Sequence, residues 1–137
     1  QQEILSERCN HCSHPPCVHA CPTGASHVRE GGTVLVDGNK CTGCKACIAS
    51  CPYGARYVHP QGYVDKCTFC LHLQDENGEY DRDAGRWPAC AKTCPGHAII
   101  FGDLDDPDSE VSTILRERNA VRLKEALGTE PSVYYLL

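Results

Sequence analysis

The spacing of twelve cysteines constrains the fold of this 137-residue chain more than any other feature. The cysteines form three sets of four, and each set ends in Cys-x3-Cys-Pro. The first set is Cys9, Cys12, Cys17 and Cys21, the second is Cys41, Cys44, Cys47 and Cys51, and the third is Cys67, Cys70, Cys90 and Cys94. A short residue pair and an extended segment follow each of the three prolines, so the chain contains an internal repeat.

Three chemistries explain so many cysteines: a disulfide scaffold, zinc sites or iron-sulfur clusters. The second set reproduces the C-x2-C-x2-C-x3-C-P run, which supplies three thiolates to one cubane and a fourth to its neighbour. Disulfides need well-separated partners, whereas these cysteines lie only a few residues apart. Zinc remains an alternative for the third set, in which two cysteine pairs are separated by 19 residues as in a zinc ribbon. Beside the first two sets, iron-sulfur clusters are favoured.

The composition indicates that aliphatic packing is not the main source of stability. The hydrophobic fraction is 41%, but 12 of these residues are cysteine. Ordinary apolar side chains therefore make up roughly a third of the chain, which is modest for a packed core. We expect the fold to depend on its clusters more than on its aliphatic core.

The segments between the cysteines predict short strands. Two β-hairpins are expected, with strands at residues 27–29 and 33–36 and at residues 56–59 and 63–65. A third short strand is predicted at residues 98–101. The insertion at residues 71–89 is expected to be mostly a solvated loop, with Trp87 packed over a cluster.

The C-terminal part predicts a helix and an extended tail. Asp106 is expected to cap a helix that begins at Pro107 and ends near Arg118. A second helical stretch is predicted over residues 119–127, with Gly128 stopping it. The apolar tail at residues 133–137 is expected to be extended and docked, either on the first of these helices or on a partner.

Other features exclude several classes of function. No run approaches the roughly 18 apolar residues of a membrane helix, and a net charge of -5 disfavours a nucleic-acid surface. No nucleotide fingerprint or Ser-His-Asp constellation is present, so no catalytic residues are predicted. His11 and His14 are expected to be hydrogen-bonding or surface residues rather than ligands. The basic residues near cysteines either raise cluster potentials, meet an acidic partner or are solvated charges; they are Arg8, Lys40, Lys45, Arg56 and Lys66.

The motifs around the cysteines resemble a known family. Cys9-Asn10-His11-Cys12, Cys21-Pro22-Thr23-Gly24-Ala25, Lys66-Cys67-Thr68-Phe69-Cys70 and Phe101-Gly102-Asp103-Leu104 are similar to motifs of the four-cluster ferredoxin-like subunits of molybdopterin oxidoreductases. Within that family the chain looks most like the electron-transfer subunits of polysulfide, thiosulfate, tetrathionate and respiratory arsenate reductases. The resemblance covers nearly the whole chain, including residues 128–135. It implies an α+β, ferredoxin-like iron-sulfur fold.

The resemblance also implies which cysteines share a [4Fe-4S] cluster. In a two-cubane repeat the last cysteine of each set binds the neighbouring cluster. Cys9, Cys12, Cys17 and Cys51 are expected to hold one cluster, and Cys41, Cys44, Cys47 and Cys21 the other. Cys67, Cys70, Cys90 and Cys94 are expected to hold a third cluster, unless Cys94 serves a fourth.

The family carries one more four-cysteine set at its N-terminus, and nothing before Cys9 supplies it here. Since methionine is also absent at position 1, we expect that an N-terminal segment is missing from this sequence and that a fourth cluster accompanies it. The modules implied are residues 1–66 for two clusters, residues 67–104 for the third, which is half of a second double-cluster module, and residues 105–137 for a helix and docking tail.

The implied function is electron transfer without catalysis. The resemblance predicts a subunit that relays single electrons between a molybdopterin subunit, containing Mo or W, and a membrane quinone-reactive subunit or another redox partner. The chain itself is not expected to span the membrane. The alternatives are a stand-alone polyferredoxin, a hydrogenase-linked carrier or a zinc-bound interaction module. The resemblance places the complex at the periplasmic face of the cytoplasmic membrane, with the cytoplasm as the alternative.

Overall fold

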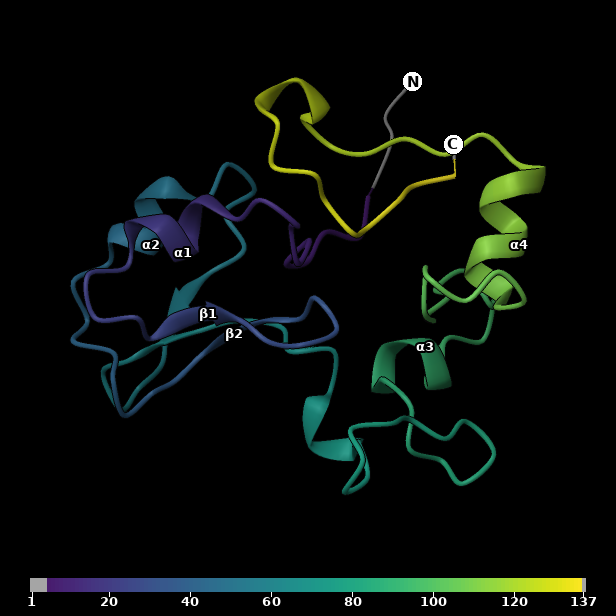
Figure 1. Ribbon diagram of the computed structural model, residues 1–137, viewed down its shortest axis with the longest axis horizontal. Coiled ribbons are helices and arrows are strands. Elements are labelled where there is room, and N and C mark those ends of the chain that lie inside the picture. Colours follow the sequence, from purple (N-terminus) through teal and green to yellow (C-terminus); the bar gives the residue numbers. More distant parts are fainter. Residues whose placement is uncertain (1–4, 137) are drawn as a thin grey trace. The chain divides into compact units, whose positions relative to one another are not determined.

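The computed structural model describes residues 5–136 (Figure 1). The chain divides into two compact units. The first contains the residues up to Thr68 together with Arg122–Tyr134, and the second contains Phe69–Val121 and the residues from Tyr135 onward. Short helices and small antiparallel sheets are both present, as the α+β prediction requires.

In the first unit, a short helix followed by a hairpin occurs twice. The elements are α1 (Pro16–Ala20), β1 (Ser26–Val28) and β2 (Val34–Val36), then α2 (Ala46–Ser50), β3 (Tyr57–Val58) and β4 (Val64–Asp65). Both strand pairs are antiparallel, with His27 opposite Leu35 in one hairpin and Val58 opposite Val64 in the other. The two predicted hairpins are confirmed; β1 begins one residue earlier than predicted, and the other three strands are shorter than predicted.

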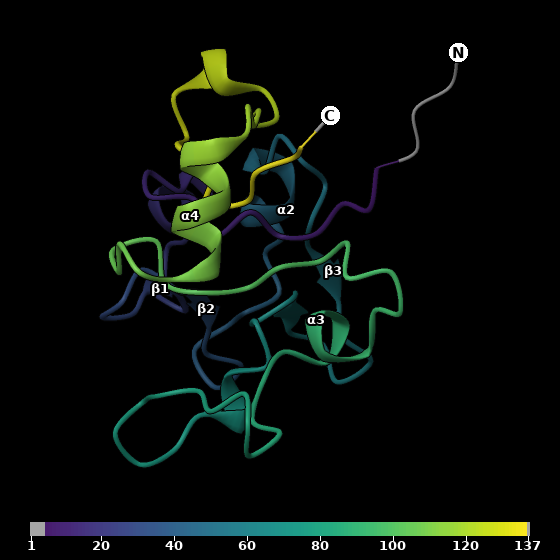
Figure 2. The same cartoon turned by 90° about the vertical axis from the view of Figure 1, so that its right-hand side faces the viewer.

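The two repeats of the first unit pack against each other. α1 contacts α2, and both hairpins lie on the same side of this helix pair, below it in Figures 1 and 2. Each repeat contributes one helical cysteine and one strand valine to the buried core, which contains Cys17, Val34, Cys47 and Val64. So few buried apolar side chains agree with the modest aliphatic content of the sequence.

The three cysteine sets share one local backbone conformation. The residue before the second cysteine of each set has a positive φ: 42° at His11, 75° at Gly43 and 57° at Phe69. The last cysteines are all extended, with φ and ψ of -76° and 117° at Cys21, -73° and 115° at Cys51, and -66° and 111° at Cys94. The following proline disfavours helical geometry at these three cysteines, so each short helix ends there. The internal repeat seen in the sequence is therefore also a repeat of the backbone.

The second unit is built around an aromatic cluster. It contains η1 (Leu71–Leu73), α3 (Ala89–Thr93) and α4 (Glu110–Glu117). The Phe101 ring packs edge-on against Phe69, Tyr80 and Trp87, with centroid distances of 5.3, 5.0 and 5.3 Å. The Tyr80 hydroxyl also donates to the Phe69 carbonyl at 2.7 Å. The packing of Trp87 over a cluster stays a prediction.

Three predictions about the second half of the chain were wrong in detail. Residues 98–101 form no strand, since no described strand pairs with them, and Phe101 joins the aromatic cluster instead. α4 begins at Glu110 because Ser109, not Asp106, accepts the capping hydrogen bond, from Ser112 N at 3.3 Å. The Asp106 carboxylate accepts from Asp108 N at 3.0 Å and turns the chain before the helix.

The predicted helical stretch at residues 119–127 is reduced to a single turn. It is η2 (Glu125–Leu127), in the first unit. Gly128 ends this turn with a φ of 71°, as the prediction of a glycine stop requires.

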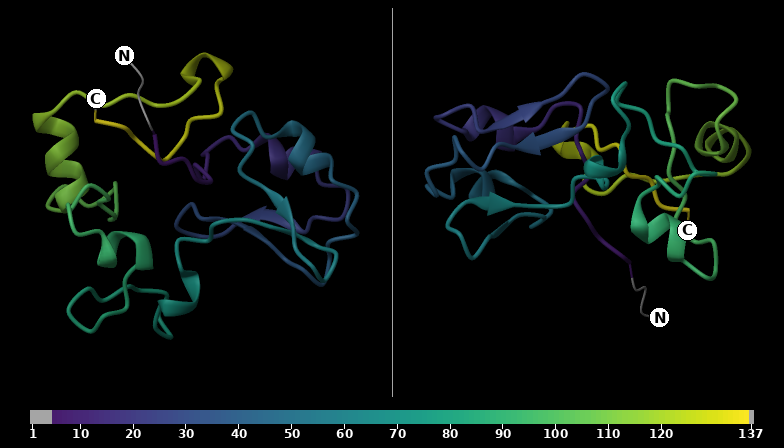
Figure 3. Two further views of the ribbon diagram at one scale, coloured as in Figure 1. Left: turned by 180° about the vertical axis from the view of Figure 1, so that it is seen from behind. Right: turned by 90° about the horizontal axis from the view of Figure 1, so that it is seen from below.

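Residues 129–132, which we call the C-terminal strap, run along residues 10–14 within the first unit (Figure 3). Ser13 N donates to Glu130 O at 2.8 Å, His14 N to Thr129 O at 3.0 Å, and Ser132 N to Asn10 O at 2.8 Å. Thr129 and Pro131 are buried in consequence. Residues 122–134 therefore belong to the first compact unit. The predicted division by cluster binding, into residues 1–66, 67–104 and 105–137, stays a prediction.

The tail that follows the strap pairs with the chain itself. In the second unit, Tyr135 and Val121 exchange backbone hydrogen bonds of 2.9 and 2.8 Å. This partner lies beyond the end of α4, so the predicted docking of the tail on that helix stays a prediction. Leu137 lies outside the described residues, and a contact of the tail with a partner stays a prediction.

Candidate iron-sulfur cluster sites

Cys9, Cys12, Cys17 and Cys51 surround one open cavity of about 320 Å³ in the first unit. We call this group the first thiol site. Cys9 and Cys12 come from the N-terminal loop, Cys17 from α1 and Cys51 from the end of α2. The structure thus brings together the four cysteines that the sequence analysis assigned to one cluster; their ligation of iron stays a prediction.

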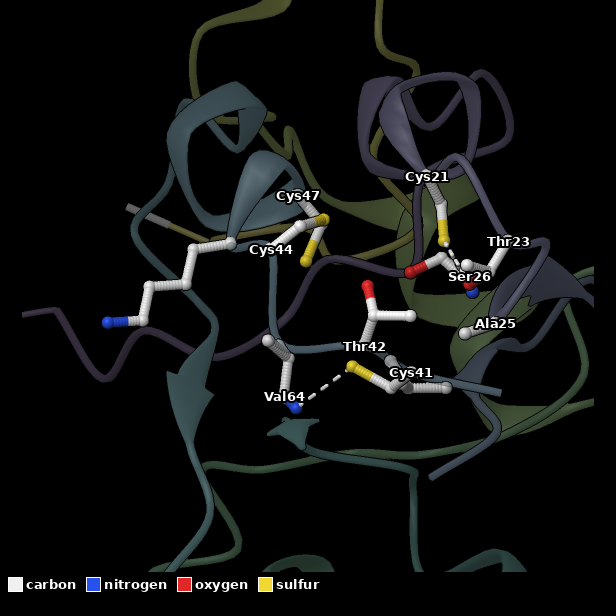
Figure 4. A pocket seen from close by; sticks show the side chains of 11 residues that line it. Cys21, Thr23, Ala25, Ser26, Cys41, Thr42, Cys44, Cys47 and Val64 are labelled. Atoms are coloured by element: carbon white, nitrogen blue, oxygen red, sulfur yellow. Dashed lines mark hydrogen bonds between the residues drawn. The ribbon is translucent and has the colours of Figure 1, made fainter. Parts of the chain in front are cut away.

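Cys21, Cys41, Cys44 and Cys47 surround a second open cavity of about 300 Å³ (Figure 4). We call this group the second thiol site. Cys21 follows α1, Cys41 and Cys44 lie in the loop before α2, and Cys47 lies in α2. These are again the four cysteines that the sequence analysis grouped together.

Each of the two packed helices serves both sites. α1 presents Cys17 to the first thiol site and ends at Cys21 of the second, and α2 presents Cys47 to the second and ends at Cys51 of the first. Two positions four residues apart are separated by about 6 Å along a helix axis. The two sites are therefore close neighbours joined by covalent chain at both helices.

Buried polar groups surround the first thiol site. Arg56 is 6% exposed, and its Nη2 donates to Cys17 Sγ at 2.9 Å. Lys66 is 4% exposed, and its Nζ donates to the carbonyls of Val34 and Cys67. Burial lowers the pKa of Lys66, and the nearby Cys9 thiol opposes this effect. The side-chain amide of Asn10 is also buried at this cavity, and neither its nitrogen nor its oxygen has a hydrogen-bond partner.

These groups fit an anionic, sulfur-rich cofactor. Buried cations and buried amides are costly unless an acceptor satisfies them, and four cysteine thiolates around a cavity are the donor set of a [4Fe-4S] cluster. Burial raises the pKa of the Cys12 and Cys17 thiols, so cluster binding must displace their protons.

Backbone N–H groups surround the second thiol site. Ser26 N donates to Cys21 Sγ and Val64 N to Cys41 Sγ, both at 3.4 Å. The hydrogen bond from Ser26 lowers the pKa of the Cys21 thiol to about 7, which favours the thiolate form that metals bind. Lys40 and Lys45, close in sequence to these cysteines, are exposed, so they fit the expectation of solvated charges.

His11 is a structural hydrogen-bonding residue. Its side chain is 1% exposed; Val34 N donates to Nδ1 at 3.0 Å, and Nε2 lies 3.0 Å from Cys67 O. Burial, followed by the nearby Lys66, lowers the pKa of His11 to about 3. The ring is therefore neutral and donates from Nε2, which fixes the loop between Cys9 and Cys12.

The strap contributes residues to the first thiol site that the sequence analysis did not identify. Burial raises the pKa of the Cys12 thiol and the nearby Thr129 hydroxyl opposes this effect; the same hydroxyl lies 2.6 Å from the Tyr53 hydroxyl. Tyr53 lines the cavity and also donates to Leu123 O at 3.0 Å. No local motif marks Thr129, because its partners lie far away in the sequence.

The third cysteine set divides between the two units. Cys67 belongs to the first unit, whereas Cys70, Cys90 and Cys94 belong to the second. Within the second unit, Ala89 N donates to Cys70 Sγ at 3.4 Å, and the backbone N–H of Ala98 lowers the pKa of the Cys94 thiol. Ligation of a third cluster by this set stays a prediction. Across residues 5–136, no three His, Cys, Asp or Glu side chains are placed to hold a single metal ion.

Replacing Gly43 with alanine is expected to destabilise the second thiol site. Gly43 has a φ of 75°, and an added Cβ would lie 3.0 Å from Gly62 O. Gly54→Ala is the matched control, because Gly54 has a φ of 62° but nothing within 4 Å of an added Cβ. The left-handed backbone alone costs about 1–2 kcal/mol in either variant. Denaturant unfolding of the cluster-loaded chain should therefore show a larger loss for Gly43→Ala, and equal losses would contradict the role of the close contact.

Comparison with known proteins agrees with this geometry. The family described as "4Fe-4S dicluster domain" matches residues 1–104, and the chain belongs to this family. It is 47% identical to protein NrfC of Escherichia coli over 134 residues, 96% of this chain and 56% of that protein. It is 45% identical to a tetrathionate reductase subunit of Salmonella typhimurium over 136 residues, 97% of this chain and 51% of that protein. It is 49% identical to a sulfite dehydrogenase subunit of Allochromatium vinosum over 130 residues, 93% of this chain and 53% of that protein.

The comparisons support the assignment of the chain to iron-sulfur proteins of electron transport, with a small ferredoxin-like fold that binds [4Fe-4S] clusters. The chain spans about half the length of the curated relatives that it matches. Among the helices of the described residues, none has the length and apolar character needed to cross a bilayer.

Proposed function

We propose that this chain is the electron-transfer subunit of an oxidoreductase complex and carries single electrons between cluster sites. The observation that carries this proposal is the pair of adjacent four-thiol sites that share α1 and α2. Neighbouring clusters provide a path for electrons. The residues of the chain supply thiolates, orient them and donate hydrogen bonds to their sulfurs.

The proposed partner is a molybdopterin subunit containing Mo or W, with a membrane quinone-reactive subunit or another redox protein on the other side. Relatives named as subunits of tetrathionate reductase and sulfite dehydrogenase support a catalytic partner. We place the complex at the periplasmic face of the cytoplasmic membrane. We also propose a third cluster on Cys67, Cys70, Cys90 and Cys94, because this set repeats the backbone of the first two.

Anaerobic purification from the native host tests this function. The cluster-loaded chain is expected to contain iron and acid-labile sulfide in equal amounts and to co-purify with a molybdopterin subunit. Addition of the substrate of that subunit should change the oxidation state of the clusters: a substrate that is reduced reoxidises reduced clusters, and a substrate that is oxidised reduces oxidised clusters. The measurement is the loss or gain of the electron paramagnetic resonance (EPR) signal of the reduced clusters.

The other functions give different results in the same experiment. A stand-alone polyferredoxin or hydrogenase-linked carrier contains clusters but purifies without a molybdopterin subunit. A zinc-bound interaction module is colourless and contains neither iron nor sulfide.

A further inference from the structure

The two thiol sites are alike in the placement of their cysteines but differ in the groups around them. At the first site the buried cation Arg56 donates to Cys17 Sγ, and a second buried cation, Lys66, lies near Cys9. At the second site the sulfurs accept from neutral backbone N–H groups, and Cys21 Sγ lies 3.6 Å from the Thr23 hydroxyl. The two thiol sites therefore have similar arrangements of cysteines but different charges in the residues around them.

The buried cations of the first site have no carboxylate partner in the part of the chain that the structure describes. Among residues 5–136, no Asp or Glu oxygen lies within 4.0 Å of the Arg56 or Lys66 side-chain nitrogens. Besides Cys17, Arg56 contacts the neutral Ser26 hydroxyl, to which Nη1 donates at 2.6 Å. A buried cation without a counter-ion is costly, so the negative charge that compensates it must come from the first thiol site itself.

The orphaned amide of Asn10 adds to the same asymmetry. Its nitrogen is a buried donor at the first cavity, and no acceptor among the described residues reaches it. A cluster sulfide or cysteine sulfur at the cavity supplies an acceptor that this N–H otherwise lacks.

Reduction of a cluster adds one negative charge, so cations and hydrogen-bond donors around it stabilise the reduced state. Hydrogen bonds to the sulfurs and net charge are among the factors that set cluster potentials. Charges in a low-dielectric interior act strongly, whereas exposed charges such as Lys40 and Lys45 are weakened by solvent and salt.

From this asymmetry we infer that the first thiol site holds its cluster at a higher midpoint potential than the second, and that Arg56, Lys66 and Asn10 set the difference. This inference rests on the proposed function in requiring a cluster at both sites. Arg56 has the largest effect, because its guanidinium is always charged and lies in direct contact with a ligand sulfur. These three are positioning residues for electron transfer.

The test is an EPR-monitored redox titration of the cluster-loaded full chain at fixed pH. Signals are assigned with Cys51→Ala and Cys21→Ala, which each remove one ligand from a different site. At a fixed solution potential, Arg56→Gln is expected to raise the oxidised-to-reduced ratio of the first cluster at least tenfold. A tenfold change corresponds to a fall of about 59 mV in the midpoint potential of a one-electron couple. Arg56→Lys retains the charge and should restore most of the potential. Lys40→Gln, an exposed cation beside Cys41, is the matched control and should move neither cluster.

The inference is overturned if the second cluster has the higher potential, or if Arg56→Gln shifts both clusters equally or neither. Should Arg56→Gln fail to load its clusters, Asn10→Leu tests the same point, since it removes an uncharged donor and should lower only the first potential. A chain that loads clusters and exchanges electrons with its partner but has the potentials in reverse order overturns this inference and leaves the proposed function standing. A chain without clusters overturns both.

Discussion

Removal of iron from the cluster-loaded chain is expected to unfold the first unit. α1 and α2 have five residues each, and the hairpin strands have two or three. Isolated helices shorter than about 12 residues and single two-stranded hairpins are marginal in water. The core that joins these elements contains Cys17, Val34, Cys47 and Val64, so two of its four side chains are themselves predicted ligands. Loss of the clusters also leaves Arg56 and Lys66 buried without a counter-ion.

Far-UV circular dichroism and amide hydrogen exchange measure this effect. After anaerobic chelation of iron, most of the secondary-structure signal should disappear and residues 9–68 should lose their protection from exchange. Return of iron and sulfide under reducing conditions is the control, and it should restore both. A cooperative thermal transition of the apoprotein near the temperature of the loaded protein would contradict the dependence on clusters.

Replacing Cys51 with alanine is expected to abolish the cluster built on Cys9, Cys12 and Cys17. Cys51 follows the helix that belongs to the second cysteine set, but its side chain lines the first cavity. The variant should retain the cluster on Cys41, Cys44 and Cys47, so its iron content should fall by one cluster.

Cys21→Ala is the matched control for this crossing of ligands. Cys21 follows α1 and lines the second cavity, so this variant should lose the other cluster. The two variants together should give complementary EPR spectra, each lacking a different signal. Loss of the Cys41 cluster in Cys51→Ala would mean that each set closes on itself.

The parts of the fold that follow local rules could be predicted from the sequence. Proline after Cys21, Cys51 and Cys94 ends each short helix at the cysteine, whatever the surroundings. Glycine-containing turns between β-favouring residues specify the two hairpins. The grouping of the eight cysteines around the two cavities agrees with the one that the family resemblance implies.

Two kinds of feature could not be predicted from the sequence. One is the outcome of competition between neighbouring polar groups, and the other is contact between residues far apart in the chain. Asp106 and Ser109 are both good helix caps, and only the folded turn decides that Ser109 accepts the hydrogen bond. Residues 98–101 have strand-forming side chains, but a strand needs a partner. Thr129 lies beside the N-terminal loop, where its carbonyl accepts from His14 N, because the chain returns to that loop, and no spacing rule encodes this return.

The strap is synthesised after every cysteine of the first thiol site, so the surroundings of this site are completed late in protein synthesis. Ser132 donates to the carbonyl of His11, 121 residues earlier in the chain, and the Thr129 carbonyl accepts from His14 N. A ribosome therefore makes every cysteine of both thiol sites before it makes the strap. The cysteines of the second thiol site, from Cys21 to Cys47, need no residue of the strap around them. All residues around the second thiol site can therefore fold before the strap is made. The N-terminal loop of the first thiol site lacks its hydrogen-bond partners until the strap has left the ribosome.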